Sequence, residues 1–185
     1  LSGSEGSWNL FRQLTDPQIE QLSTLHITGS LSNQKLFFLQ QHEGALKGSG
    51  LVLDGACDPG MLGELLSVCR PALLISEAPV ALTEPGKCMA LSHIELLWLE
   101  ADPDRNPDLF AHCSNLETLI ISGWEPETGE LLSLAGAGSL HTLTLAECGM
   151  TDFSCLEFPP SLRRLHVIDC ENLTGIGEVQ QLKGL

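Results

Sequence analysis

Residues 116–121 read LETLII, residues 140–145 read LHTLTL and residues 162–167 read LRRLHV. Each hexapeptide places an apolar residue at its first, fourth and sixth positions, and IELLWL at residues 94–99 does the same. Alternation over the last three positions is typical of a β-strand that buries one of its faces. These four stretches therefore predict four strands of one kind, repeated along the chain.

Weaker copies of the pattern precede these four. Residues 22–27 fit it fully, whereas residues 48–53 and 70–75 lack the first apolar residue. The last apolar positions of all the copies are 27, 53, 75, 99, 121, 145 and 167. Successive copies are thus separated by 22 to 26 residues, which indicates about seven repeats of one structural unit.

This repeat resembles that of the leucine-rich-repeat family, over residues 21–185. The family pattern continues with Asn or Cys three residues after the last apolar position, where this chain has Cys148 and Cys170. Copies two to five depart from it, with Ala56, Ala78, Asp102 and Trp124 at that position. The resemblance implies an α/β solenoid shaped as a curved horseshoe. A parallel β-sheet would line its concave face, with short helices and irregular segments on its convex face.

The repeats divide the chain into two parts. Residues 1–20 are expected to form a tail and a short capping helix, and residues 21–185 the repeat array. Residues 182–185 begin a further copy and then stop, so we expect an array truncated at its C-terminal end. Repeat arrays normally end in a polar cap, and an array without one is expected to associate end to end.

Short helices are predicted between several of the strands. Ser32 precedes a predicted helix at residues 34–46, and Asp58 precedes another at residues 61–68. Ser and Asp are favoured N-caps, because their side chains accept a hydrogen bond from the first turn. Residues 127–134 are expected to form a similar short helix.

The charge of the chain narrows its partners. The 185 residues carry 9 Lys and Arg against 24 Asp and Glu, a formal net charge of −15. Such a chain would be repelled by nucleic-acid phosphates and by acidic membrane surfaces. No stretch is long and apolar enough to span a bilayer, and the N-terminus has no signal-peptide pattern. The sequence therefore predicts no nucleic-acid partner, no membrane partner and a cytoplasmic location.

Cysteine and histidine spacing indicates no catalytic or metal centre. The seven Cys residues are widely spaced, odd in number and without a C-x-x-C pair, which favours reduced, buried thiols. His141 and His166 fall on neighbouring predicted strands but have no third ligand. No nucleophile motif or phosphate-binding glycine loop occurs. We therefore expect a protein that is not an enzyme and needs no cofactor.

The residues between the inward apolar positions are predicted to face the concave surface. From first copy to last, the central column reads His26, Val52, Leu74, Trp98, Ile120, Thr144 and His166. Its middle is apolar and its borders are acidic, a pattern typical of an interface with a basic protein surface. Trp98 is the expected anchor, since Trp is frequent at interface hot spots. The predicted partner-binding residues are Val52, Asp54, Leu74, Glu77, Leu96, Trp98, Glu100 and Ile120.

Two short segments suggest biological settings. SLRRLHVIDCENL at residues 161–173 resembles repeats of intracellular innate-immune receptors, which implies a ligand-sensing or autoinhibitory segment of a larger protein. LFAHCSNL at residues 109–116 is more similar to F-box ubiquitin-ligase adaptors, which implies substrate recognition. A microbial effector or surface protein that binds host protein is a third hypothesis, and an enzyme whose catalytic domain lies outside this segment is a fourth.

Overall fold

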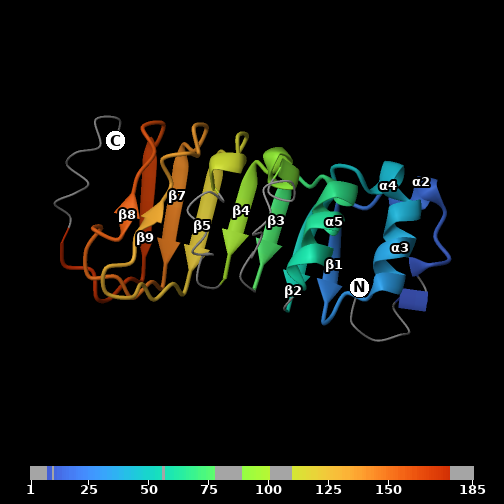
Figure 1. Cartoon of the computed structure of the whole chain (residues 1–185), viewed down its shortest axis with the longest axis horizontal. Helices are drawn as coiled ribbons and strands as arrows, with labels where there is room; N and C mark the ends of the chain where they lie inside the picture. The colour runs from blue at the N-terminus through green and yellow to red at the C-terminus, as the bar shows by residue number, and fades with distance from the viewer. Residues whose placement is uncertain (1–7, 10, 56, 78–88, 101–109, 176–185) are drawn as a thin grey trace.

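The computed structural model describes residues 8–9, 11–55, 57–77, 89–100 and 110–175. Its centre is a parallel sheet of seven strands whose order along the sheet follows the order along the chain (Figure 1). The strands are β1 (Thr24–Thr28), β2 (Gly50–Asp54), β3 (Leu73–Ser76), β4 (Leu96–Leu99), β5 (Thr118–Ser122), β7 (Thr142–Ala146) and β9 (Arg164–Ile168). Each repeat identified in the sequence thus supplies one strand.

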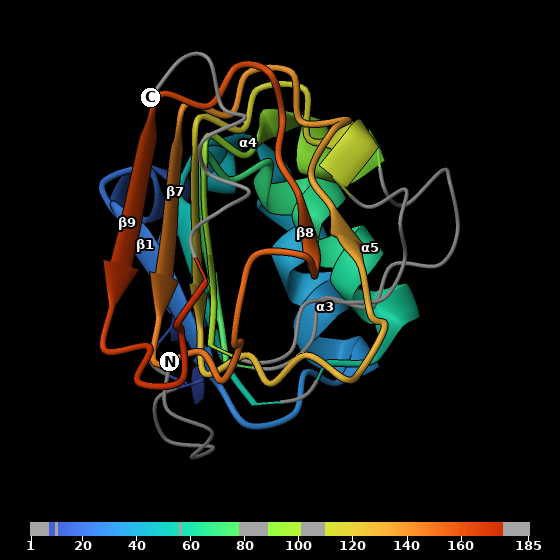
Figure 2. The ribbon, with the colours of Figure 1, turned by 90° about the vertical axis from the view of Figure 1, so that its left-hand side faces the viewer.

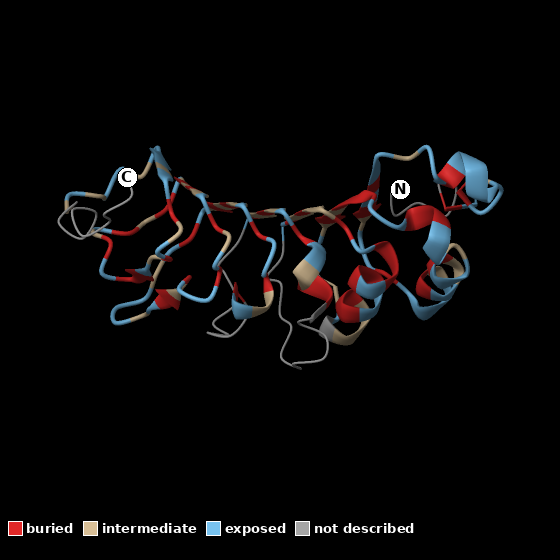
Figure 3. Ribbon diagram, turned by 90° about the horizontal axis from the view of Figure 1, so that it is seen from above, coloured by how far each residue is buried: buried red, intermediate tan, exposed pale blue. Residues whose placement is uncertain are grey.

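The described segments between the strands lie on one face of the sheet and leave the other open (Figures 2 and 3). Near the N-terminal end they are helices, and further along they are shorter turns and a second parallel pair of strands. The elements on this covered face are α3 (Asn33–Gln41), α4 (Glu43–Leu46), α5 (Pro59–Cys69), η1 (Met89–His93), η2 (Phe110–His112), β6 (Leu132–Ser133) and β8 (Leu156–Glu157).

The hydrophobic core lies between the sheet and this covering layer. In β5 and β7, the alternating residues Leu119, Ile121, Leu143 and Leu145 are completely buried. Their neighbours in the same strands are only partly buried. The alternation read from the sequence therefore does assign one face of these strands to the core, as the pleat of a β-strand requires.

The turns after the strands repeat as well. The residue after each of β1, β2 and β5 is a glycine with positive φ, and after β7 and β9 it is Glu147 and Asp169, with φ of 54° and 50°. Three residues past the last inward strand position, the thiols of Cys148 and Cys170 lie 3.4–3.7 Å from backbone carbonyl oxygens that they bond. Cys148 and Cys170 thus bond the turns of their own and the preceding repeat. The corresponding Ala56, Ala78 and Asp102 lie outside the described residues.

Two of the three predicted return helices are confirmed. The Ser32 hydroxyl accepts from the backbone N–H of Lys35 at the start of α3, and His42 separates α3 from α4. Asp58 Oδ1 accepts from the first turn of α5 at 2.9 and 3.2 Å.

The helix predicted at residues 127–134 is wrong. In this segment Leu132 and Ser133 form β6, which pairs in parallel with β8. Leu131 is 58% exposed and Leu132 is buried, an alternation that suits a strand. Pairing with the following repeat therefore decides the structure of this segment.

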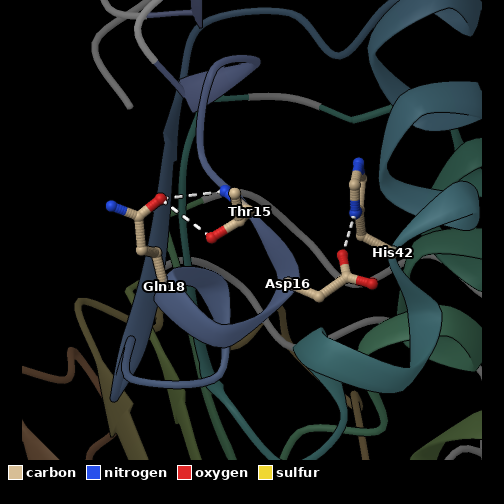
Figure 4. A network of polar contacts seen from close by, with 4 residues as sticks. All are labelled: Thr15, Asp16, Gln18 and His42. Atoms are coloured by element: carbon tan, nitrogen blue, oxygen red, sulfur yellow. Dashed lines mark hydrogen bonds and ion pairs between the residues drawn. The ribbon is translucent and has the colours of Figure 1, made fainter.

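The N-terminal segment includes a short helix, as expected, α2 (Asp16–Ile19). The Gln18 side-chain oxygen accepts from both the backbone N–H and the hydroxyl of Thr15, each at 3.0 Å (Figure 4). Asp16 Oδ1 lies 2.5 Å from Nδ1 of His42, at the junction of α3 and α4. Trp8 is buried nearby and stacks on Phe11. These contacts join the segment to the first repeat, although the predicted boundary at residue 20 stays a prediction.

Candidate protein-binding face

The open face is the side of the seven-stranded sheet that the helices and turns leave uncovered (Figure 3). Strand pairing lines its side chains up in columns that run across the strands. The central column, in strand order, consists of His26, Val52, Ile75, Trp98, Ile120, Thr144 and His166. Its four middle members are apolar and partly exposed.

A second apolar pair lies beside the central column. Leu73 pairs with Leu96, and both are partly exposed. Six side chains from four adjacent strands therefore form one apolar surface, which we call the apolar patch. Its members are Val52, Leu73, Ile75, Leu96, Trp98 and Ile120.

Trp98 lies near the middle of the apolar patch. Its neighbours in the central column are Ile75 and Ile120. The indole Nε1 donates a hydrogen bond to Ser122 Oγ at 3.1 Å. Because the acceptor Ser122 lies on the adjacent strand β5, this hydrogen bond fixes the direction of the indole ring. The apolar surface of the ring remains available to a partner.

The prediction that Leu74 belongs to this column is wrong. Its side chain is completely buried and pairs with Leu51 and Leu97, both core residues. Leu73 and Ile75 face outward instead, so the prediction was displaced by one residue in β3. Three consecutive apolar residues give no alternation, and a shift of one residue moves every side chain of a strand to the opposite face.

A signal for the correct register is present beside this strand. Asp54, Glu77 and Glu100 each directly follow the last inward residue of their strand, namely Leu53, Ser76 and Leu99. Aligning the three acidic residues places Leu74 in the core. Ser76 is 3% exposed, so a serine occupies the second inward position of this copy and the apolar pattern is displaced by one residue.

Asp54, Glu77 and Glu100 occupy equivalent positions on neighbouring strands, and we call these three residues the acidic column. The backbone N–H of Glu77 donates to Leu53 O, and that of Glu100 donates to Ser76 O, at 3.1 and 2.9 Å. These bonds bring the three acidic residues to neighbouring positions on β2, β3 and β4. The column adjoins the apolar patch on one side.

Electrostatics within the acidic column are unfavourable. The pKa of Glu77 is raised above its ordinary value by a hydrogen bond to Asp54 and by the negative charge of that residue, with further contributions from desolvation and Glu100. Nε2 of His26 lies 3.9 Å from Asp54 Oδ2. In the described part of the chain, no Lys or Arg lies within ion-pair distance of these three carboxylates. The column therefore presents excess negative charge.

The structure thus brings together seven of the eight residues predicted to bind a partner. Val52, Leu96, Trp98 and Ile120 belong to the apolar patch, and Asp54, Glu77 and Glu100 form the acidic column. Leu73 and Ile75 were missed as members of the patch, for the register reason given above. Their partner-binding role stays a prediction.

Other surfaces of the described chain offer less chemistry. A hollow of about 470 Å³ lies between the turns at residues 126–131 and 149–155, with Glu127, Glu130 and Asp152 among its lining residues. No group of three or more His, Cys, Asp or Glu residues within the described ranges is arranged to hold a metal ion.

The thiols are poorly suited to nucleophilic chemistry. Burial raises the pKa of Cys69 to about 12 and that of Cys148 to about 11. A thiol must ionise to react, and these two remain protonated at neutral pH.

Among the described residues, no helix has the length and apolar character that crossing a membrane requires. No protein-family model, curated protein or solved structure matches the chain.

Proposed function

We propose that the chain is a leucine-rich-repeat solenoid that recognises another protein, without catalysis, through the open face of its sheet. The observation that carries the proposal is the apolar patch centred on Trp98. Contiguous exposed apolar surface is unusual on a monomer and marks interaction sites. Here it comes from four adjacent strands, so the backbone holds it in a preformed arrangement.

Three features support recognition by this face rather than by another. The indole of Trp98 is oriented by Ser122, so a partner meets a ring whose rotational freedom is already reduced. The acidic column supplies charge beside the patch, which favours a basic partner and disfavours acidic competitors. The outward residues can vary without disturbing the core, because the alternate residues hold the sheet together.

Residues 161–173 are the basis for proposing a wider biological setting. Within the proposal, the chain is the sensing or autoinhibitory segment of a larger intracellular receptor of the innate-immune type, located in the cytoplasm. The resemblance of that segment is the support for this part of the proposal. The free thiols of Cys57, Cys69, Cys113, Cys148, Cys155 and Cys170 are compatible with a reducing compartment.

The experiment is a comparison of captured proteins. The full chain and its Trp98→Ala and Ile120→Lys variants are immobilised, and proteins from cells that naturally express the chain are captured and identified by mass spectrometry. Phe37→Ala is the matched control, because Phe37 is 61% exposed but lies on α3, away from the open face. Thermal melts confirm that each variant is folded.

We expect proteins that are captured by the parent and the Phe37→Ala variant and are lost with both open-face variants. Two substitutions of different chemistry separate loss of the surface from local loss of packing around the indole. If folded open-face variants capture the same proteins as the parent, recognition by this face is refuted.

A further inference from the structure

The shape and charge of the open face restrict what kind of partner segment fits it. The apolar patch and the acidic column run side by side, and both cross the strands rather than following one of them. A partner segment that uses both must therefore lie across β2, β3, β4 and β5. This inference rests on the proposed function, since it concerns the partner of the same face.

The spacing of the central column can be compared with regular backbone structures. Val52, Ile75, Trp98 and Ile120 belong to four adjacent strands, and neighbouring strands lie about 4.8 Å apart. Their backbones therefore span roughly 14 Å across the sheet. A segment that matches this series needs an apolar side chain about every 5 Å on one side.

An α-helix provides that spacing. Its side chains at i, i+3 or i+4 and i+7 recur on one face about every 5 Å, because each residue rises about 1.5 Å. Four such side chains cover about 16 Å, close to the span of the column. In an extended segment, alternate side chains are about 6.6 Å apart, so four of them cover about 20 Å and lose register with the column.

Charge complementarity determines the flank of that helix. The acidic column lies two residues along the strands from the central column, a separation of about 7 Å. This is the lateral distance at which side chains flanking the apolar stripe of a helix lie. Without a Lys or Arg of the described chain in ion-pair distance of the column, a cationic partner would relieve the repulsion between these neighbouring carboxylates.

We propose that the open face binds an amphipathic helix that lies across β2–β5, with its apolar stripe on the apolar patch and Lys or Arg along the flank that meets Asp54, Glu77 and Glu100. Apolar anchors at i, i+3 or i+4 and i+7 are the recognised form of such binding. The apolar stripe supplies most of the buried area, and the basic flank sets the direction in which the helix lies.

The test uses a displayed library of random 20-residue peptides selected on the full chain. A parallel selection uses the Asp54→Asn, Glu77→Gln, Glu100→Gln variant. The matched control is Glu20→Gln, Glu43→Gln, Glu171→Gln, which removes the same number of negative charges from exposed positions outside the acidic column. Affinities of the enriched peptides are then measured at low and at physiological ionic strength.

We expect enriched peptides with apolar residues at helical spacing and basic residues along one flank. Neutralising the acidic column should weaken their binding at least tenfold, because losing close charge pairs across an interface weakens binding by about that factor or more. The matched control should weaken it by less than about threefold, since distant surface charges are screened. Trp98→Ala should weaken it as well.

Two results would overturn the helical partner. One is enrichment of peptides with alternating apolar residues or without basic residues, and the other is equal weakening by the two triple variants. Neither result affects the proposed function, which fails only if the proteins captured from cells are insensitive to Trp98→Ala and Ile120→Lys.

Discussion

The indole of Trp98 is the residue on which the proposed recognition depends most. Strand β4 places it between Ile75 and Ile120, and the hydrogen bond to Ser122 Oγ holds its ring. Trp124 contrasts with it, because its side chain is completely buried and its Nε1 has no hydrogen-bond partner among the described residues. Trp98 is thus available for a contact, whereas Trp124 fills the core at the cost of an unpaired donor.

Glu77 gives a prediction about pH. A carboxyl group whose pKa is higher in the folded chain than in the unfolded chain binds its proton more tightly when folded, so stability falls as the pH rises through that pKa. Glu77 is such a group, because of the hydrogen bond and charge of Asp54. We expect Glu77→Gln, which cannot ionise, to raise the melting temperature at pH 7.

The advantage of Glu77→Gln should shrink as the pH falls towards the ordinary carboxyl pKa of 4.5, because Glu77 itself is then protonated. Glu20→Gln, at an exposed position away from the acidic column, is the control and should leave the melting temperature nearly unchanged. A melting temperature at pH 7 that is unchanged or lower in Glu77→Gln would contradict repulsion within the acidic column.

Trp124 gives a prediction about packing. Replacing it with Phe removes packing atoms but also removes the unpaired buried N–H, whose burial costs about 1–3 kcal/mol. We therefore expect Trp124→Phe to lower the unfolding free energy by no more than about 1 kcal/mol, since the two effects offset each other. Trp124→Ala should cost about 3–5 kcal/mol, because it opens a cavity. Chemical denaturation measures both, and similar large losses would show that the N–H is not a burden.

At the scale of the elements, the strands could be placed from the sequence where both inward positions of a copy are apolar. LETLII and LHTLTL both place their inward residues correctly in β5 and β7. β3 could not be placed, because Leu73, Leu74 and Ile75 are all apolar and the inward position after them is a serine. Residues 127–134 could not be assigned either, since β6 depends on its pairing with β8. Such pairing is a long-range property that local propensity does not contain.

The consequence for the candidate site follows from the same cause. Side chains on strands whose two inward positions are both apolar, such as Val52, Trp98 and Ile120, could be assigned to the open face. Those on β3 could not be, because the second inward position of that strand is Ser76. Pairing with β2 and β4 supplies the missing information.

The register of β3 gives a prediction at this scale. Leu74→Ala should lower the unfolding free energy by about 2–5 kcal/mol, because Leu74 is completely buried. Ile75→Ala should cost less than about 1.5 kcal/mol, since Ile75 is partly exposed on the open face. Denaturant titration of the two variants measures the difference. A larger loss for Ile75→Ala than for Leu74→Ala would restore the register expected from the sequence.

At the scale of the whole molecule, one core and one open face run along the same sheet. Buried residues from every strand but the last form a continuous cluster beneath the sheet, so the outward side chains are carried by a common framework. The net charge of −15 attracts any basic protein over long range, but such attraction is screened by salt. Binding through the open face should therefore persist at physiological ionic strength, because it also involves contact with the apolar patch. Attraction by the net charge alone should not persist.

The most direct test of recognition by the open face is the affinity of a captured partner for the full chain and for Trp98→Ala, measured by calorimetry at physiological ionic strength. A hot-spot residue contributes at least about 2 kcal/mol, so the substitution should weaken binding roughly thirtyfold or more. Phe37→Ala, which removes an exposed aromatic side chain from α3, should bind like the parent. Equal affinity of the parent and a folded Trp98→Ala variant would contradict the account.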